Sequence, residues 1–314
     1  MLIHFWGVRG SLPSPLTGDQ VQAKISAAIA RMSPKDARDE DSKMRFLSSL
    51  PDWIYGTAGG NTPCVELKAS DGNSFLLDCG SGIRMMAKYG VQPKDSVYNI
   101  FLSHFHWDHI QGLPFFDPIF RSASKINVYS VYPDMEFYVS GQSSLPYFPE
   151  NACYPAMRER FSFHLLDEDS EISIGNVKIR CHKMTHPGGS CAFRFTENGR
   201  SVVYCTDAEL QGSDFDETAA NSAFFSDTDV IIIDSQYTST EAVSKEYWGH
   251  SAYSTAIDFA ERWKVRNLYM FHYDPTYDDR KLDSMLQAGI VYQKYNSDSS
   301  TKIYLAKEGQ EIQL

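Results

Sequence analysis

The chain has 314 residues, of which 42% are hydrophobic and 22% are charged, as is usual for a globular protein of one large domain or two small ones. Its net charge of −11 argues against a protein that grips long RNA or DNA, because such proteins present a basic surface to the phosphate backbone. We find no signal peptide and no run near the roughly 18 apolar residues of a membrane span. The six cysteines lie far apart, and reduced, buried thiols predict a cytoplasmic protein.

Strand-like and helix-like runs alternate along the chain, which predicts an α/β fold. The predicted strands cover residues 1–8, 63–69, 74–79, 97–103, 126–131, 171–184, 191–196, 201–206, 229–235, 267–272 and 302–307. The predicted helices cover residues 82–89, 109–116, 252–263 and 278–290. Asn198-Gly199 indicates a hairpin turn. Ser251 is the predicted N-cap of the helix over 252–263.

Two stretches interrupt this alternation. Residues 18–55 are polar and partly helical, and residues 115–165 are rich in aromatic residues and proline. We interpret each as an insertion or a lid within one domain spanning residues 1–314. Either insertion is a candidate for a substrate lid or for a homodimer contact, and the sequence leaves that choice open.

The most informative segment is the hexapeptide His104-Phe105-His106-Trp107-Asp108-His109, which holds three of the nine histidines and a carboxylate. An apolar run over 97–102 precedes it, so we expect a buried strand that leads into a polar loop. One histidine at a strand end is usually a satisfied polar residue, but packing alone does not explain three with an aspartate. Neutral imidazole and carboxylate are the usual ligands of zinc, manganese and iron, so the segment predicts a metal centre.

A reactive metal site takes ligands from several loops, and three other residues fit that role. His186, Asp207 and His272 each follow an apolar strand-like run. Taken singly, each has an ordinary interpretation as a turn residue, a helix cap or a buried hydrogen-bonded side chain. Taken with the hexapeptide, they are predicted to lie on the same rim.

These motifs resemble, in order and over most of the chain, those of the metallo-β-lactamase superfamily. The matching residues are Asp78, His104, His106, Asp108, His109, His186, Asp207 and His272. The resemblance implies a four-layered αββα sandwich with its site at one edge of the two sheets. It also implies that Asp78 supports the metal loop rather than binding metal.

The same resemblance implies two divalent metal ions, with zinc favoured and manganese or iron as alternatives. The implied first metal site consists of His104, His106 and His186. The implied second site consists of Asp108, His109 and His272, and Asp207 bridges the two. A hydroxide held between the metals would attack phosphorus in line with the leaving oxygen, which makes Asp108 and Asp207 part of the catalytic machinery.

Other segments indicate which branch of the superfamily the chain resembles. Gly249-His250-Ser251 is similar to the Gly-His-Ser-Thr element of tRNase Z, although Ala252 replaces the threonine. Residues 5–11, 59–64 and 271–275 look closer to a group of bacterial metal-dependent hydrolases described as cyclic-nucleotide phosphodiesterase-like. Some members of that group carry an insertion like residues 18–55.

His250 is the candidate general acid for the leaving alkoxide, and the plainer interpretation is a residue that caps the following helix. Asp234 or Glu241 could orient it, and the sequence does not choose between them. Ser11, Asn61 and Thr62 lie in Gly-rich loops, where they either bind phosphate or serve turn geometry.

Arg9 is expected to pair with a phosphate or with Asp78. Aromatic residues from Phe115 to Phe161 either form a lid that stacks a base or belong to the core.

The leading hypothesis is a hydrolase of a small phosphodiester, with a 3′,5′-cyclic nucleotide as the first candidate. A tRNase Z-like RNA 3′-end endonuclease is the alternative, which the acidic charge and the absence of an evident basic arm disfavour. A hydrolase of a thioester, a lactone or a cyclic phosphate on the same scaffold is a third. A non-catalytic metal-dependent sensor or redox protein is a fourth, and retention of every ligand disfavours it.

Overall fold

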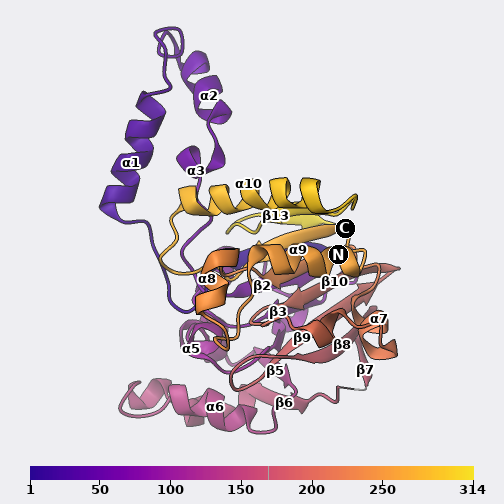
Figure 1. The fold of residues 1–314 in the computed structure, drawn as a ribbon. Coiled ribbons are helices and arrows are strands. Elements are labelled where there is room, and N and C mark those ends of the chain that lie inside the picture. Colours follow the sequence, from indigo (N-terminus) through magenta and orange to yellow (C-terminus); the bar gives the residue numbers. More distant parts are fainter. Residues whose placement is uncertain (169) are drawn as a thin grey trace.

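Two seven-stranded sheets form the centre of the protein, and helices lie outside them (Figure 1). The structure is a computed structural model that describes residues 1–168 and 170–314. The strand order is β14-β1-β2-β3-β4-β5-β6 in the first sheet and β13-β12-β11-β10-β9-β8-β7 in the second. In each sheet the neighbours pair antiparallel on one side and parallel on the other. This arrangement confirms the predicted α/β class and the αββα sandwich.

The strands of each sheet have the following bounds. The first sheet contains β1 (Leu2–Gly7), β2 (Cys64–Lys68), β3 (Ser74–Leu77), β4 (Val97–Phe101), β5 (Lys125–Ser130), β6 (Phe161–Leu165) and β14 (Glu311–Gln313). The second sheet contains β7 (Glu171–Ile174), β8 (Val177–Met184), β9 (Ser190–Glu197), β10 (Arg200–Cys205), β11 (Val230–Asp234), β12 (Asn267–Phe271) and β13 (Lys302–Leu305).

The helices pack on the outer faces of the sheets or form an arm. They are α1 (Gly18–Ile29), α2 (Glu40–Ser49), α3 (Asp52–Tyr55), α4 (Ile83–Tyr89), α5 (Trp107–Ile110), α6 (Met135–Gln142), α7 (Ala219–Phe225), α8 (Ser239–Ser244), α9 (Tyr253–Arg262) and α10 (Asp279–Asn296). Among the described residues, no helix combines the length and the apolar character that crossing a bilayer requires.

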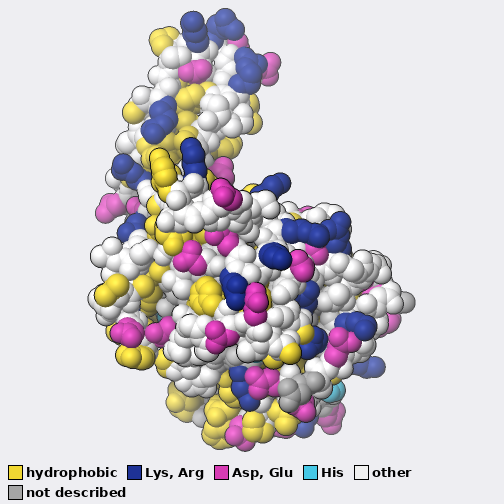
Figure 2. Space-filling view, turned by 45° about the vertical axis from the view of Figure 1, so that its right-hand side comes forward, with side chains coloured by type: hydrophobic (Ala, Val, Ile, Leu, Met, Phe, Trp, Pro, Cys, Tyr) yellow, Lys and Arg dark blue, Asp and Glu magenta, His cyan; other side chains and the backbone are white. Residues whose placement is uncertain are grey.

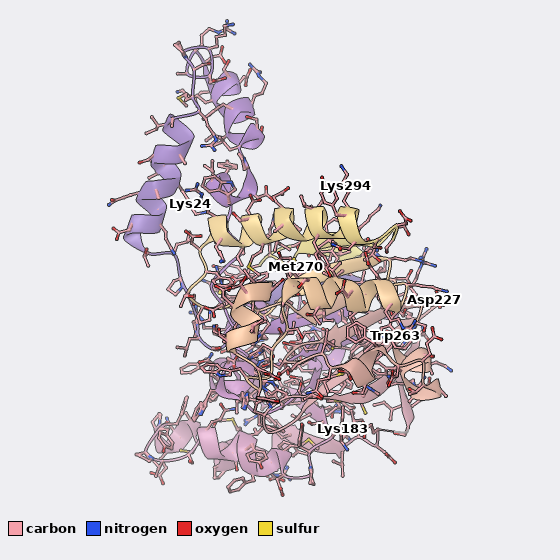
Figure 3. The ribbon with its side chains drawn as sticks, in the orientation of Figure 1. Lys24, Lys183, Asp227, Trp263, Met270 and Lys294 are labelled. Atoms are coloured by element: carbon pink, nitrogen blue, oxygen red, sulfur yellow. The ribbon has the colours of Figure 1, made fainter. Side chains whose placement is uncertain are left out.

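Alternating side chains of the strands supply two hydrophobic cores. In β4, Phe101 points between the sheets, where its ring contacts Phe193 and Phe195 of β9 at centroid distances of 5.5 and 5.2 Å. Ile100 points to the other face and packs under α4 and α6. Side chains fill the space between the layers, as for Met270 of β12, which is fully buried (Figure 3). Because successive residues of a strand point to opposite faces, the same strand packs against the other sheet and against the outer helices.

Most sequence predictions of secondary structure are confirmed. Each predicted strand overlaps an observed one, and residues 171–184, predicted as one strand, form the hairpin of β7 and β8. Asn198 and Gly199 have φ angles of 51° and 74°, which is the left-handed backbone that a two-residue hairpin turn requires. β6 and β14 were not predicted.

Two local predictions were wrong. The helix predicted over 109–116 is only the single turn of α5 followed by a 3-10 turn, Leu113–Phe115, because Pro114 lacks an amide hydrogen to continue an α-helix. Ser251 does not cap α9, whose N-cap is Ala252. The Ser251 hydroxyl instead donates to the carbonyl of Ala208 at 2.7 Å and accepts from the Leu210 amide at 3.0 Å.

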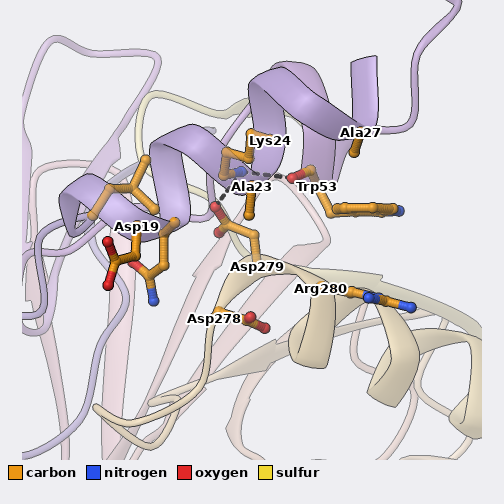
Figure 4. A pocket seen from close by; sticks show the side chains of 10 residues that line it. Asp19, Ala23, Lys24, Ala27, Trp53, Asp278, Asp279 and Arg280 are labelled. Atoms are coloured by element: carbon orange, nitrogen blue, oxygen red, sulfur yellow. Dashed lines mark hydrogen bonds and ion pairs between the residues drawn. The ribbon is translucent and has the colours of Figure 1, made fainter. Parts of the chain in front are cut away.

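Residues 18–55 form an arm of α1, α2 and α3 that stands clear of the sandwich (Figures 1 and 2). Phe46, Leu50 and Ile54 give the arm a small core of its own. Lys24 connects the base of the arm to the sandwich. Its ammonium lies 2.6 Å from the Asp279 carboxylate and 2.6 Å from the carbonyl of Trp53 (Figure 4). These residues line a hollow between α1 and α10. A half-buried ion pair with further hydrogen bonds holds the arm to the start of α10.

Part of the segment over 115–165 belongs to the first sheet, as β5 and β6. The parts outside the sheet run over 115–124 and 131–160, and the second of these contains α6. α6 lies at the bottom of the molecule in Figure 1, on the same side as α5.

Candidate metal centre

The predicted ligands converge because the strands that carry them end at the same edge. β3 and β4 are parallel neighbours, as are β10, β11 and β12, so their carboxyl ends lie side by side. Asp78 follows β3, and His104 begins the loop shortly after β4. Asp207 and His272 follow β10 and β12, while Asp234 ends β11. The edge therefore collects polar groups from strands that are far apart in sequence.

Three overlapping groups of potential ligand atoms form at this edge. The first group is His104, His106, His186 and Asp207, and the second is Asp108, His109 and His272. The third is Asp207, His250 and His272. Within each group, the nitrogen and oxygen atoms all lie within 4.8 Å of one another. The residues that the sequence assigned to a metal thus lie together at one edge.

Asp207 faces the first and second groups with different oxygen atoms. Its Oδ2 lies 3.5 Å from His104 Nε2 and 3.6 Å from His186 Nε2. Its Oδ1 lies 3.1 Å from His109 Nε2 and 3.2 Å from His272 Nε2. One carboxylate between two sets of imidazoles is the geometry required of a ligand shared by two cations.

Asp78 sits behind the ligands and holds their loop. It accepts hydrogen bonds from the Ser103 amide and hydroxyl at 2.8 Å each, and from the Tyr204 hydroxyl at 2.8 Å. It also lies 2.7 Å from His109 Nδ1. That contact turns His109 Nε2 toward the cluster, so Asp78 positions a candidate ligand.

His186 is oriented by the loop that carries His250. Its Nδ1 donates to the carbonyl of Gly249 at 2.8 Å, which leaves Nε2 facing Asp207. Gly249 has a φ of 88°, and a Cβ there would lie 2.2 Å from His186 Nδ1, so only glycine allows this approach. Glu209 fixes the same loop by accepting from the amides of Tyr247 and Gly249 at 2.8 Å each.

Three site residues have strained backbones. Asp78, Asp207 and His272 have φ angles of 60°, 49° and 61°. Asp78 and His272 directly follow β3 and β12, and Asp207 lies two residues after the end of β10. Such conformations cost about 1–3 kcal/mol each and persist where the surrounding structure determines them, as it does at functional sites.

The charge states of His104 and Asp207 match what a metal requires. Burial, reinforced by the neighbouring His109, holds the pKa of His104 well below its ordinary value, so its imidazole is neutral. Burial alone would raise the pKa of Asp207, but the imidazoles of His109 and His272 hold it well below its ordinary value. A neutral imidazole and an ionised carboxylate are the forms that bind a metal.

The chemistry of the donor set also fits cations. Asp78, Asp108, Asp207 and Asp234 are all buried, and among the described residues none of the four pairs with a lysine or an arginine. The Nε2 atom of His104 is buried and has no hydrogen-bond partner among the described residues. Buried carboxylates and an unpaired imidazole nitrogen are costly unless positive charge compensates them.

His250 stands next to the first and second groups, and Asp234 orients it. Its Nδ1 lies 2.7 Å from Asp234 Oδ2, while Glu241 instead accepts from Thr238 and Tyr277. Its ring stacks on His272 with a centroid distance of 5.0 Å. Burial alone would lower the pKa of His250, but the charge and hydrogen bond of Asp234 raise it to about 9.

The remaining candidates divide between the site and the loops that support it. The amide of Ser11 donates to Asp108 Oδ2 at 2.7 Å, so Ser11 contacts the second group.

Asn61 and Thr62 are engaged in loop structure. Asn61 bonds to Glu308 and Ser81, and the fully buried Thr62 bonds to Ser81 and Gln111. The Arg9 guanidinium donates to the carbonyls of Gly59 and Tyr277, and no pairing with Asp78 is seen among the described residues.

Tyr204 and Glu209 are positioning residues that the sequence did not identify. Tyr204 lies inside an apolar strand, and Glu209 lies in a loop without a recognisable motif. Their roles depend on contacts across 126 and 40 residues, which no local pattern encodes.

Comparison with known proteins agrees with the fold and the cluster, which together define a metallo-hydrolase. A sequence model of the beta-lactamase superfamily domain matches residues 73–273. Ribonuclease Z of Picrophilus torridus is 27% identical, over 78% of this chain and 93% of that protein. The crystal structure of the metallo-beta-lactamase fold protein YhfI from Bacillus subtilis has a TM-score of 0.65 at 17% identity, covering 99% of this chain and 98% of that one.

The crystal structure of unliganded yeast PDE1 has a TM-score of 0.62 at 16% identity, covering 81% of this chain and 95% of that one. Both solved structures show the shared fold. The matched family model spans well over half of the chain, so the chain belongs to the beta-lactamase superfamily. The fold of this superfamily implies divalent metal ions, which the His and Asp cluster is suited to hold.

The role of Asp78 leads to a testable prediction. Asp78→Asn removes the charged acceptor behind His109, so zinc affinity should fall by about 10- to 100-fold. Competition with a chromophoric chelator measures this directly. Asp71→Asn, which changes a carboxylate in a remote turn, is the matched control. Equal zinc affinities of the Asp78 variant and the unaltered protein would contradict the supporting role.

Proposed function

We propose that this protein is a dinuclear metal-dependent hydrolase of a small phosphodiester, with a 3′,5′-cyclic nucleotide as the first candidate. The observation that carries the proposal is Asp207, whose two oxygens face two separate groups of imidazoles. Two adjacent cations would supply the charge that stabilises the phosphoryl oxygens and would lower the pKa of attacking water. His104, His106 and His186 would hold one cation, Asp108, His109 and His272 the other, and Asp207 would hold both.

His250 is the proposed general acid. Its Nδ1 bonds to Asp234, so its Nε2 is the nitrogen available to give a proton to the leaving oxygen. A pKa of about 9 keeps the ring protonated at neutral pH, although cations bound a few ångströms away would lower that value by charge repulsion. Asp234 then acts as a positioning residue, because it fixes the ring and favours the protonated form.

An RNA 3′-end endonuclease is the second candidate, and the identity to a ribonuclease Z favours it. Two features weigh against it. The net charge of −11 repels a polyanion. The projecting arm over 18–55 contains six basic and six acidic residues, so it offers no net positive charge to an RNA backbone.

The test is hydrolysis by protein freed of metal and reloaded with zinc or manganese. We expect turnover of bis-p-nitrophenyl phosphate, cyclic AMP or cyclic GMP, and a loss of about a thousandfold in Asp207→Ala. Comparing the two metals also addresses which ion the site prefers. Cleavage of a tRNA precursor in preference to every small diester would favour the endonuclease. Absence of diester turnover by fully loaded protein would favour a thioester or lactone hydrolase.

The role of His250 predicts a dependence on the leaving group. His250→Ala should slow hydrolysis of a cyclic nucleotide by about 10²- to 10⁴-fold, because the departing alkoxide needs a proton. Hydrolysis of bis-p-nitrophenyl phosphate should fall much less, since p-nitrophenolate is a weak base. His164→Ala, at the edge strand β6, serves as the control and should affect neither substrate. Equal losses on both substrates would rule out the general-acid role.

A further inference from the structure

Two neighbouring hollows lie beside the loop over 104–109, and the nearer one is lined by ligands of the first group. The nearer hollow, of about 190 Å³, is lined by His104 and His106 together with Phe105 and Tyr138. The second hollow, of about 310 Å³, shares Phe105 and Tyr138 with the first. The two rings lie 4.8 Å apart between centroids, so they form the wall common to both hollows. A ligand in the second hollow would therefore extend from the metal centre across this wall.

Aromatic rings of α5 and α6 surround the second hollow. Trp107, Phe137 and Tyr147 line it with 69%, 72% and 73% of their surfaces exposed. Large apolar rings gathered at one place on a surface usually mark a binding site. Trp107 directly follows the candidate ligand His106, so the rings begin at the metal loop itself. Among the described residues that line the two hollows, none is a lysine, arginine, aspartate or glutamate.

Gln142, at the end of α6, is the one polar side chain in this lining with a free donor and a free acceptor. It is only 8% exposed, and neither its Oε1 nor its Nε2 has a hydrogen-bond partner among the described residues. A buried amide without partners is unfavourable, because it has given up its bonds to water. Both atoms are closed off from solvent, so they would bond to a ligand's neighbouring donor and acceptor once the side chain turns toward the hollow.

We propose that this second hollow, lined by Phe105, Trp107, Phe137, Tyr138, Gln142 and Tyr147, is the subsite for the heterocyclic base of a nucleotide substrate. The base stacks on the aromatic rings, as bases do on protein aromatic side chains. The edge of the base pairs with the Gln142 amide, which matches any base edge that places a donor next to an acceptor. The placement of the phosphate at the metal centre rests on the proposed function.

The lining favours a single base over other occupants. A polynucleotide would need cations along its backbone, and the hollow provides none. A purely apolar ligand would stack equally well but would leave the Gln142 amide without partners. The volume of about 310 Å³ is at the small end of the range for ligand pockets, which suits one ring system.

Calorimetry with two ligands tests the subsite without requiring turnover. The zinc-loaded protein is titrated with adenosine 5′-monophosphate and with ribose 5-phosphate, which carries the same phosphate without a base. We expect adenosine monophosphate to bind at least about tenfold more tightly. Gln142→Leu and Phe137→Ala should each reduce that ratio about fivefold or more. Tyr89→Ala removes an exposed ring on α4, outside the hollow, and should leave the ratio unchanged.

The outcomes separate the subsite from the proposed reaction. Equal affinities for the two ligands, or no binding of either, would overturn the base subsite even if diesters are hydrolysed. A strong preference for adenosine monophosphate that both variants lose would establish the subsite even if no diester is cleaved. A preference that survives in both variants would place the base elsewhere and would also overturn the proposal.

Discussion

Burial of negative charge at one edge of the sandwich is the constraint on which the site depends. Asp78, Asp108, Asp207 and Asp234 lie at this edge, and their partners are imidazoles, hydroxyls and amides rather than lysine or arginine. Buried carboxylates are costly unless positive charge compensates them, and bound divalent cations would supply that charge. The fold provides the place for them, since parallel strands of both sheets deliver their carboxyl ends to the same edge.

The contacts behind the ligands determine which nitrogen of each ring faces the cluster. Asp78 fixes His109, the Gly249 carbonyl fixes His186, and Asp234 fixes His250. The same loop that carries His250 therefore also orients a candidate ligand, which links the proposed general acid to the first metal group. His106 lines the nearer aromatic hollow, and Trp107 lines the second. The proposed phosphate chemistry and base recognition would therefore share the loop that contains these two residues.

The sequence predicts most strands well, because apolar runs are local signals, and the family resemblance predicts the sandwich. It does not choose between Asp234 and Glu241 as the partner of His250, since both lie in plausible loops and only the tertiary packing separates them. It also misassigns Ser251, whose hydroxyl serves a distant carbonyl instead of the helix that follows. The helix predicted over 109–116 is wrong because Pro114 prevents the turn of α5 from continuing as an α-helix.

The most direct test of the metal centre is a crystal structure of zinc-loaded protein with anomalous diffraction measured on either side of the zinc edge. The account predicts two anomalous peaks about 3.5–4 Å apart, with the carboxylate of Asp207 in contact with both zinc ions. A single peak, or two peaks of which Asp207 contacts only one, would contradict the dinuclear centre from which the proposed chemistry follows.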